Sequence, residues 1–514
     1  MAHRYAERIA VRDNAGAITY RVLFHRAAAL GHALRDAGVT PAEPVVTFFR
    51  NGIPAVVAHY AVMLSGAADV PINPALSEAD VGVCIDIAKA RRVISSRELA
   101  GQFRELGLQV ICAEDCGEAE LDAGSFPPLP ASGLARVVFT SGTTGLPKGA
   151  VHDQEGRWVA NLLLRASLPQ VASERQNLLL VTPFAHGSSL MTLAYHGRGE
   201  MVTLLDGADP DVVLPLIERG EIDEMFAPPT VLTKLVDAAG DRALLGLRTI
   251  FCGTAVLTPT LYQRARRVFG PIIRVTYGKS EVFNPITVLQ PAETDAWYSE
   301  RGMDADACVG WTAPGVEIAI RTEDGRTAAA GEEGEVFIRA RHMMRGYLRA
   351  EGFEQLGADG FHDTGDLGYF DPIGRLHLTG RIAEMIKTGG YKVSPEEVER
   401  ALAPAVAPST VAALGITSEY WGQVIVAAVE SPAAGWQERI EEASRALTGY
   451  KRPRAFIALE SLPRNGIGKI RRASIRDHIG ECYRLVDGPR PRLEPKTSSD
   501  DPRPARSDGM QEQP

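Results

Sequence analysis

The chain has 514 residues, too many for one compact core, so at least two domains are expected. Its formal net charge is −9, and 45% of its residues are hydrophobic, as in ordinary globular proteins. Its basic residues form no stripe or basic domain of the kind that nucleic-acid-binding proteins carry. The bulk numbers therefore argue against a nucleic-acid partner.

Several features bear on the cellular compartment. The first residues, 1–13, are polar and lack the apolar centre of a signal peptide. The longest apolar stretch, 53–70, is interrupted by Pro54 and Gly66 and is too mixed to span a bilayer. The cysteines are scattered and form no metal-type pair: Cys84, Cys112, Cys116, Cys252, Cys308 and Cys482. We therefore expect a cytoplasmic protein with reduced thiols and no membrane span.

The first part of the chain alternates between helical and strand patterns. Residues 21–37 have helical apolar spacing and end at Gly38. Further helices are expected at 53–64 and 75–90, and strands at 44–49, 68–72 and 92–94. This alternation is typical of a mainly parallel sheet that is covered on both faces.

The same pattern recurs from residue 135 to about 289, and then the texture changes. Apolar runs that predict buried strands lie at 135–140, 178–181, 201–205, 224–227, 249–252 and 272–277. From 309 to 378, short runs at 317–321, 334–339 and 375–378 are separated by glycine-rich turns. This second texture favours a small antiparallel sheet or barrel.

A compact segment follows, with a helix expected at 395–402 and strands at 411–415 and 423–429. The last residues, 483–514, are rich in Pro, Asp, Ser and Arg, which predicts disorder. We therefore predict an α/β fold with a large N-terminal domain, 1–380, of parallel-type sheets with helices and a small antiparallel sheet or barrel. A small α+β C-terminal domain, 381–482, and a disordered tail, 483–514, complete the chain.

The strongest chemical signal follows the strand expected at 135–140. It reads Val138-Phe-Thr-Ser-Gly-Thr-Thr-Gly-Leu-Pro-Lys-Gly149. Its glycines let the backbone approach a ligand closely, its hydroxyls offer hydrogen bonds, and Lys148 adds a positive charge, as a polyphosphate requires. It is not the P-loop of phosphoryl-transfer enzymes, because no Gly-Lys-Ser/Thr ends it. The segment indicates a phosphate-binding loop.

With this loop and further segments in the same order, the chain resembles the superfamily of acyl-CoA synthetases, carrier-loading adenylation domains and firefly-type luciferases. The resemblance extends from about Ala10 to Arg472 and is closest to fatty- or aryl-acid CoA ligases. It implies ATP, Mg²⁺ and coenzyme A as ligands. It also implies two steps: a carboxylic acid is activated to its acyl-adenylate with release of pyrophosphate, and the acyl group then passes to a thiol.

A second segment, Tyr277-Gly-Lys-Ser-Glu281, is similar to the family's next signature, with Ser280 where Thr is usual. The resemblance implies that Tyr277 stacks on adenine. It also implies that Glu281, with Thr144, holds Mg²⁺ against the phosphates. Carboxylate and phosphate oxygens are the ligands that this hard cation prefers.

Three more positions match the family. Asp366, in Thr364-Gly-Asp366, is expected to accept the ribose hydroxyls, with Arg381 as a further ribose or phosphate contact. His186 occupies a position beside the acyl pocket and the thiol tunnel, although a lone histidine is often structural.

Lys469, in Pro463-Arg-Asn-Gly-Ile-Gly-Lys469, resembles the catalytic lysine that a mobile C-terminal domain brings to the carboxylate and the α-phosphate. The family's hinge residue is Asp or Lys, and here Ala383 takes that place. Gly390 is expected to border the pantetheine channel. The residues expected to be catalytic are Lys469, Glu281, His186 and Thr144. Those expected to bind nucleotide or coenzyme A are Thr140, Ser141, Gly142, Thr143, Thr144, Lys148, Gly253, Thr254, Ala255, Tyr277, Gly278, Ser280, Asp366, Arg381 and Gly390.

The acyl pocket is expected to be formed by residues 184–191, 226–232, 252–256 and 282–286, which hold no acidic side chain for an amino group. An aromatic or medium-chain aliphatic acid is therefore favoured, with coenzyme A as acceptor. Two alternatives stay open. In the first alternative, the acceptor is an amine or a carrier-protein phosphopantetheine instead of coenzyme A. In the second, the chain is a non-catalytic nucleotide-binding protein. The presence of Lys469, Glu281 and Asp366 disfavours this second alternative.

Overall fold

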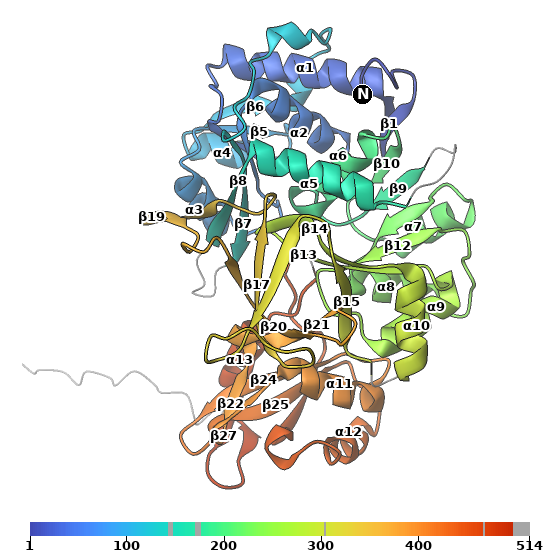
Figure 1. The fold of residues 1–514 in the computed structure, drawn as a ribbon, viewed down its shortest axis with the longest axis vertical. Coiled ribbons are helices and arrows are strands. Elements are labelled where there is room, and N and C mark those ends of the chain that lie inside the picture. The colour runs from blue at the N-terminus through green and yellow to red at the C-terminus, as the bar shows by residue number, and fades with distance from the viewer. Residues whose placement is uncertain (142–146, 170–175, 303–304, 466–467, 497–514) are drawn as a thin grey trace, which may run out of the picture. The chain divides into compact units, whose positions relative to one another are not determined.

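The computed structural model describes residues 1–141, 147–169, 176–302, 305–465 and 468–496 (Figure 1). The chain divides into two compact units. The larger comprises Met1–Ala383 together with 468–469, and the smaller comprises Glu384–Asn465 and the described chain from Ile470 on.

The larger unit contains a sheet of eight strands in the order β19-β18-β8-β7-β4-β3-β5-β6. Its parallel strands are β3 (Pro44–Phe48), β4 (Ala68–Pro71), β5 (Arg92–Ser95), β6 (Gln109–Cys112) and β7 (Leu134–Ser141). Its antiparallel strands are β8 (Pro147–Asp153), β18 (Gly346–Arg349) and β19 (Gly352–Gln355). The expected phosphate loop joins β7 to β8, and its residues 142–146 lie outside the described part of the chain.

A second sheet has thirteen strands in the order β16-β17-β20-β21-β15-β14-β13-β12-β11-β9-β10-β1-β2. Its parallel part contains β1 (Ile9–Asp13), β9 (Asn177–Leu180), β10 (Met201–Leu204), β11 (Glu224–Phe226), β12 (Thr249–Cys252) and β13 (Ile273–Lys279). Its antiparallel strands are β2 (Gly16–Thr19), β14 (Val282–Leu289), β15 (Ala307–Thr312), β16 (Val316–Arg321), β17 (Gly334–Ala340), β20 (His362–Phe370) and β21 (Leu376–Arg381). The antiparallel texture predicted after residue 309 therefore continues this sheet through the β14–β15 pair.

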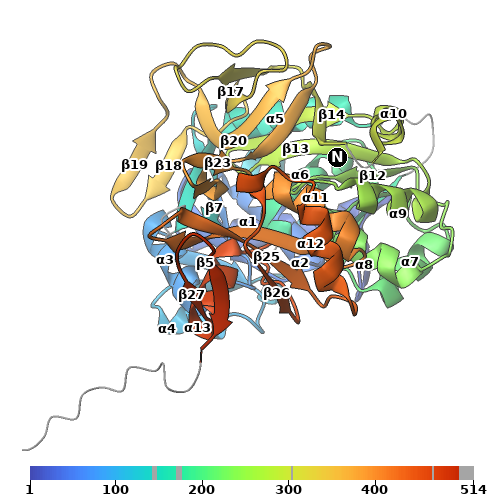
Figure 2. The ribbon, with the colours of Figure 1, turned by 90° about the horizontal axis from the view of Figure 1, so that it is seen from below.

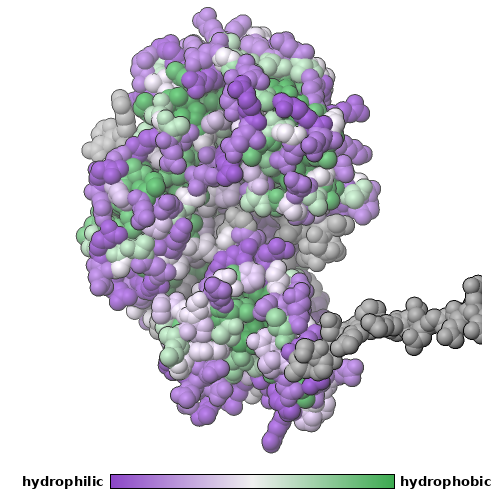
Figure 3. Space-filling model, turned by 180° about the vertical axis from the view of Figure 1, so that it is seen from behind, coloured by the Kyte–Doolittle hydropathy of each residue, from purple (hydrophilic) through white to green (hydrophobic). Residues whose placement is uncertain are grey.

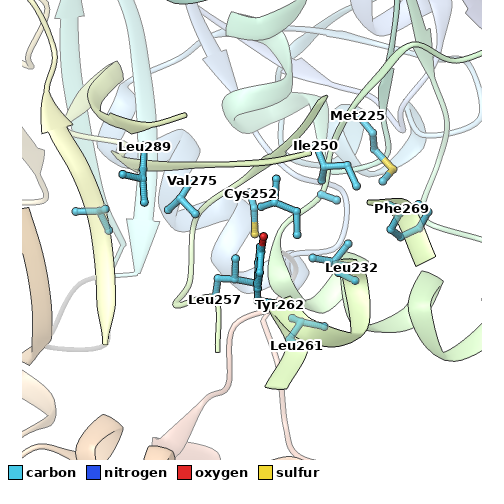
Figure 4. Packing of buried hydrophobic residues seen from close by; sticks show 14 of the residues in the cluster. Met225, Leu232, Ile250, Cys252, Leu257, Leu261, Tyr262, Phe269, Val275 and Leu289 are labelled. Atoms are coloured by element: carbon cyan, nitrogen blue, oxygen red, sulfur yellow. The ribbon is translucent and has the colours of Figure 1, made fainter. Parts of the chain in front are cut away.

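Helices cover these sheets. They are α1 (Tyr20–Asp36), α2 (Ile53–Ser65), α3 (Glu78–Ala88), α4 (Gly101–Glu105), α5 (Gln154–Ser167), α6 (Ser189–His196), α7 (Pro210–Glu218), α8 (Pro229–Ala239), α9 (Pro259–Phe269) and α10 (Pro291–Arg301). Helices α1 and α2 pack against each other (Figure 1). Strands β11 and β12 meet α8 and α9 in a core that includes Met225, Ile250, Leu232 and Leu261 (Figure 4). Burial of each such side chain contributes about 1.5–3 kcal/mol to the stability of the fold. This packing holds in place the strand ends that carry the site.

The smaller unit is an α+β fold with one five-stranded sheet and helices on both of its faces (Figure 2). Its strands are β22 (Ile386–Thr388), β23 (Tyr391–Val393), β24 (Val411–Ser418), β25 (Gly422–Glu430) and β26 (Ala455–Leu459), and its helices are α11 (Pro395–Val406), α12 (Trp436–Ser444) and α13 (Arg472–Cys482). Because successive strand side chains alternate between faces, Ala413 packs with α11 and α12, whereas Ala412 and Leu414 pack with α13. One sheet thus has a separate apolar core on each face.

The prediction of disorder from residue 483 is wrong for 483–496. Strands β27 (Tyr483–Val486) and β28 (Arg492–Pro495) form an antiparallel hairpin. Tyr483 and Leu493 pack against the α13 side of the sheet, and Arg484 pairs with Glu494 across the strands at 3.1 Å. A few apolar contacts and one cross-strand ion pair order a segment whose composition is that of a loop. The remaining predicted tail, 497–514, lies outside the described residues.

The predicted fold class is confirmed: a large α/β N-terminal part with helices and a small α+β C-terminal part. On the face shown in Figure 3, hydrophilic side chains predominate and hydrophobic ones form separate patches. Among the described residues, no helix combines the length and the apolar character that crossing a membrane requires.

One buried histidine in the antiparallel part of the second sheet holds a charge. His377 is fully buried, with its Nδ1 2.7 Å from Asp306 Oδ1 and its Nε2 3.2 Å from Asp371 Oδ2. Burial alone would lower the pKa of His377, but the hydrogen bonds to Asp306 and Cys308 outweigh burial and raise the pKa to about 10. The side chain is therefore an imidazolium between two carboxylates at neutral pH.

Replacing this cation is expected to destabilise the fold in a pH-dependent way. His377→Gln should lower the free energy of unfolding by about 3 kcal/mol at pH 7, because two carboxylates lose their buried partner. The folded pKa lies above the unfolded value of about 6.5, so the stabilisation is complete below that pH and fades as pH approaches 10. Urea unfolding at acid, neutral and alkaline pH tests this, with the exposed His3→Gln as control. A constant difference across pH would contradict the imidazolium assignment.

Candidate functional site

The predicted site residues gather where parallel strands of the second sheet end. Strands β9, β11, β12 and β13 run in parallel, with Phe226 level with both Leu180 and Phe251, and Cys252 level with Val275. Their carboxyl ends therefore lie along one edge, the usual place for a ligand in an α/β sheet. The segments after β9 and β12 include His186 and Gly253, and Tyr277 lies near the end of β13.

The chain after β12 has backbone constraints of its own. A Cβ atom at Gly253 would lie 2.6 Å from the carbonyl oxygen of Thr276, so only glycine lets the two backbones approach this closely. Thr254 has a φ of 70°, which is uncommon for a residue with a side chain. Thr254 and Ala255 are both exposed. Strained backbone of this kind clusters at ligand sites, which supports the expected role of residues 253–255.

Asp366, on β20, lies at the centre of a buried polar cluster. Its Oδ2 accepts hydrogen bonds from the Tyr277 hydroxyl and, at 3.1 Å, from Lys279 Nζ. Its Oδ1 is 3.1 Å from Arg381 Nε, at the end of β21. Lys279 also donates to the carbonyl of Thr364 at 2.5 Å. Two strand pairs far apart in sequence are thus joined through one carboxylate.

Glu281 lies two residues beyond Lys279 and forms a second cluster. The Tyr347 hydroxyl donates to Glu281 Oε1 at 2.8 Å, and Lys148 Nζ is 4.0 Å from the same oxygen. Lys148 also lies over the Tyr347 ring, 3.8 Å from its centre, in a cation–π contact. The neighbouring Ser280 carbonyl is 2.8 Å from His152 Nε2. Lys148 pairs with Thr140 on β7, so this cluster lies at the base of the expected phosphate loop.

Lys279 connects the two clusters electrostatically. Burial alone would raise the pKa of Glu281 and of Asp366, but the Lys279 charge outweighs burial and lowers both. The Tyr347 hydroxyl assists at Glu281, and Arg381 and Tyr277 assist at Asp366. Burial lowers the pKa of Lys148. Both carboxylates are therefore ionised at neutral pH, inside the protein, beside cations.

His186 lies in a short irregular turn between β9 and α6. Its φ of −111° and ψ of −135° interrupt the helical turn Phe184–Ser188. The turn is fastened by the buried Arg136, which donates to the Ala185 carbonyl at 2.9 Å and to Ser189 Oγ at 2.7 Å. Burial, with the Arg136 charge, lowers the pKa of His186 to about 4. The imidazole is therefore neutral at physiological pH and offers a polar atom without charge.

The other predicted residues divide between described and undescribed parts of the chain. Gly142, Thr143 and Thr144 lie outside the described residues, and Ser141 ends β7. Gly278 lies on β13, where a Cβ would meet Asn284 Oδ1 at 2.2 Å. In the smaller unit, Gly390 forms the β22–β23 turn with a φ of 83°. Lys469 lies three residues before α13.

Neither Lys279 nor Tyr347 is among the site residues predicted from the sequence. Lys279 lies inside the second signature, two residues from Tyr277 and two from Glu281. Residues two apart on a strand share a face, a spacing that could have indicated a shared environment. No sequence signal places the Tyr347 hydroxyl against Glu281, because the contact spans 66 positions.

The AMP-binding enzyme family matches residues 1–348, and the chain belongs to this family. It is 27% identical to a feruloyl-CoA synthase of an Amycolatopsis species, covering 92% of this chain and 96% of that one. It resembles the solved amide bond synthetase of Marinactinospora thermotolerans with a TM-score of 0.80 and 26% identity, covering 92% and 97% of the two chains. It resembles the o-succinylbenzoate CoA synthetase of Bacillus subtilis, solved with its acyl-adenylate intermediate, with a TM-score of 0.79 and 25% identity, covering 93% and 96%.

Proposed function

We propose that the chain is an AMP-forming acid–CoA ligase, which activates a carboxylic acid with ATP and passes the acyl group to coenzyme A. The observation that carries the proposal is the pair of buried, ionised carboxylates, Asp366 and Glu281, joined by Lys279 at the carboxyl edge of the sheet. Membership of the AMP-binding enzyme family and the likeness to CoA ligases support it.

The nucleotide is held at this edge. A carboxylate has about four acceptor positions, and Tyr277, Lys279 and Arg381 use three of those on Asp366. The remaining position accepts a ribose hydroxyl. Tyr277 lies under the adenine, and residues 253–255 line the same ligand. The loop 140–144 and Lys148 surround the phosphates.

The first step joins the acid to AMP. A carboxylate oxygen attacks the α-phosphorus of ATP, the bond to the β-phosphate oxygen breaks, and pyrophosphate leaves with the electron pair. Both reactants are anionic, so Lys148 and Lys469 lower the repulsion and stabilise the charge at phosphorus. The remaining work is alignment of the two reactants.

Glu281 and Thr144 are the proposed Mg²⁺ ligands. Glu281 is buried and ionised, and among the described residues no three His, Cys, Asp or Glu side chains gather as a metal site. A single carboxylate fits Mg²⁺, which takes its other ligands from phosphates and water. Bound there, the ion would neutralise phosphate charge.

The second step transfers the acyl group. The thiolate of coenzyme A attacks the acyl carbon, the bond to the AMP oxygen breaks, and the thiol proton goes to solvent. Neutral His186 borders the acyl carbon without adding a charge that would attract water or a second carboxylate. Gly390 borders the pantetheine. Residues around Ala383 are the proposed hinge between the two steps. Lys469 clusters with the larger unit by its contacts, although the chain on both sides of it, up to Asn465 and from Ile470, belongs to the smaller one.

The acid is proposed to be aromatic or medium-chain aliphatic. The four segments expected to line its pocket contain no acidic residue, and Phe226, Leu232 and Cys252 are buried apolar side chains beside the strand ends. A pocket with such an apolar lining favours binding of an apolar acyl group. A cytoplasmic location is also proposed, supported by the free state of all the cysteines.

The test is acid-dependent pyrophosphate release with ATP and Mg²⁺ over a panel of aromatic and aliphatic acids, each with coenzyme A, with hydroxylamine or with neither. The expected result is a thioester with coenzyme A and a hydroxamate with hydroxylamine for one class of acid. Formation of ADP instead of AMP would overturn the adenylation chemistry.

An amine or a carrier-protein phosphopantetheine as acceptor is the second candidate, and the likeness to an amide bond synthetase favours the amine. The same panel separates the candidates. Hydroxamate formation without any thioester would exclude coenzyme A as acceptor and direct the search to amines and carrier proteins.

A further inference from the structure

One buried arginine joins three elements of the smaller unit. Arg472 is the first residue of α13, and its side chain is 12% exposed. Its Nη1 pairs with Glu384, and its Nη2 is 2.7 Å from Glu399 Oε1 and 3.4 Å from Glu396 Oε1. Its Nε donates to the Ala413 carbonyl at 3.0 Å. All three nitrogens of the guanidinium are therefore engaged.

These partners fix Arg472 to the framework of the unit. Glu396 and Glu399 belong to α11, and Glu399 Oε1 also accepts the Ala413 amide of β24 at 2.8 Å. Glu384 is the first residue of the unit, directly after Ala383, where the hinge is proposed. Arg472 thus connects the start of the unit with α11, β24 and α13 at one point.

The segment that carries Lys469 begins and ends beside this point. A β-bridge pairs Arg464 with Ile470, and the Arg471 amide donates to the Pro463 carbonyl at 2.8 Å. The first arm is fastened by Glu430, which lies 2.8 Å from Arg464 Nη2. The second arm continues into Arg472. The two arms are therefore held by ion pairs, Arg464 to Glu430 on β25 and Arg472 to Glu384 and to two glutamates of α11.

We propose that Arg472 is a positioning residue for Lys469, which fixes the second arm of the lysine segment so that the ammonium group is placed for adenylate formation. The proposal rests on the proposed function. Gly468 and Lys469 belong to no helix or strand of the described chain, so the direction of the Lys469 backbone depends on the bridge at Ile470 and on the residues after it. A small misplacement of a reacting group costs far more in rate than in stability.

The chain offers a matched control on the same helix. Arg476 lies one turn further along α13, and its Nε donates to the Gly415 carbonyl at 3.1 Å. Arg472 makes the equivalent bond to Ala413, two residues earlier on β24. Both arginines thus fasten α13 to the strand, whereas Arg472 also binds the three glutamates. Arg476→Met removes only the shared contact.

The experiment measures the two half-reactions separately in the full chain: hydroxylamine-trapped adenylate formation, and thioester formation from supplied acyl-adenylate and coenzyme A. Arg472→Met should lower the first about 100-fold and leave the second within about threefold. Arg472→Lys keeps the charge and loses the forked set of donors, so its rate of adenylate formation should lie between those of Arg472→Met and the unaltered protein. Arg476→Met should leave both within about threefold.

Loss of both half-reactions to the same degree, or an equal effect of Arg476→Met, would show a structural role and overturn the proposal. If Arg472→Met does not fold, as judged by circular dichroism and its melting temperature, Glu384→Gln replaces it. That variant should also slow adenylate formation more than thioester formation, by a smaller factor than Arg472→Met. Equal loss in the two half-reactions would overturn the proposal. If the unaltered protein releases no pyrophosphate with any acid, the proposed function itself fails, and this inference fails with it.

Discussion

Lys469→Ala is expected to lower adenylate formation roughly 100- to 1,000-fold while thioester formation from supplied acyl-adenylate stays unchanged. In the first half-reaction two anions meet, and the lysine offsets their repulsion at phosphorus. In the second, a thiolate attacks a carbonyl carbon whose AMP leaving group is already in place. Trapping with hydroxylamine measures the first rate, and coenzyme A with synthetic acyl-adenylate measures the second.

The control is Lys496→Ala, which removes an exposed lysine of the smaller unit that donates to the Gly480 carbonyl. It should leave both rates as they are. A loss of the same size in both half-reactions for Lys469→Ala would contradict its role in adenylate formation, because it would indicate damage to folding or to a shared binding step.

The parallel part of the second sheet could be predicted because its strands are short apolar runs with glycine or proline beside them. Strands β11 and β12 are found within a residue of the predicted runs. Local pattern decides such elements, since a strand buried on both faces has few polar positions. The same reasoning located Tyr277 at a strand end, where parallel strands present their ligands.

The partners of the site residues could not be predicted. Asp366 meets Tyr277 across 89 positions of the chain, and the pairing depends on how β20 and β21 join the sheet. Arg472 meets Glu384 across 88 positions. In the sequence, the short basic run 469–472 indicates a solvated surface. Only the fold shows that carboxylates from other elements surround Arg472. The hairpin at 483–496 was missed for the same reason, because composition does not show cross-strand contacts.

Asp366→Asn is expected to raise the KM for ATP by about 10- to 100-fold, with a smaller effect on kcat. The change removes the charge from a buried acceptor and, with it, one charge-assisted hydrogen bond to the ribose, which is worth about 1.5–3 kcal/mol. Binding lost equally in the ground and transition states appears in KM. Initial rates over a range of ATP concentrations at saturating acid measure it. The matched control is Asp363→Asn, which alters an exposed aspartate on the same strand.

The same substitution is expected to destabilise the larger unit, by about 3 kcal/mol at pH 7, because Lys279 loses its buried partner. The folded pKa of Asp366 is lowered, since the Lys279 and Arg381 charges outweigh burial. Its stabilisation is therefore present above the unfolded pKa and is lost as pH falls through the folded one. The difference in melting temperature between Asp366→Asn and the unaltered chain should shrink in acid. A stability loss without any change in the KM for ATP would make Asp366 a structural clamp, and the ribose contact would then have to be sought at Arg381.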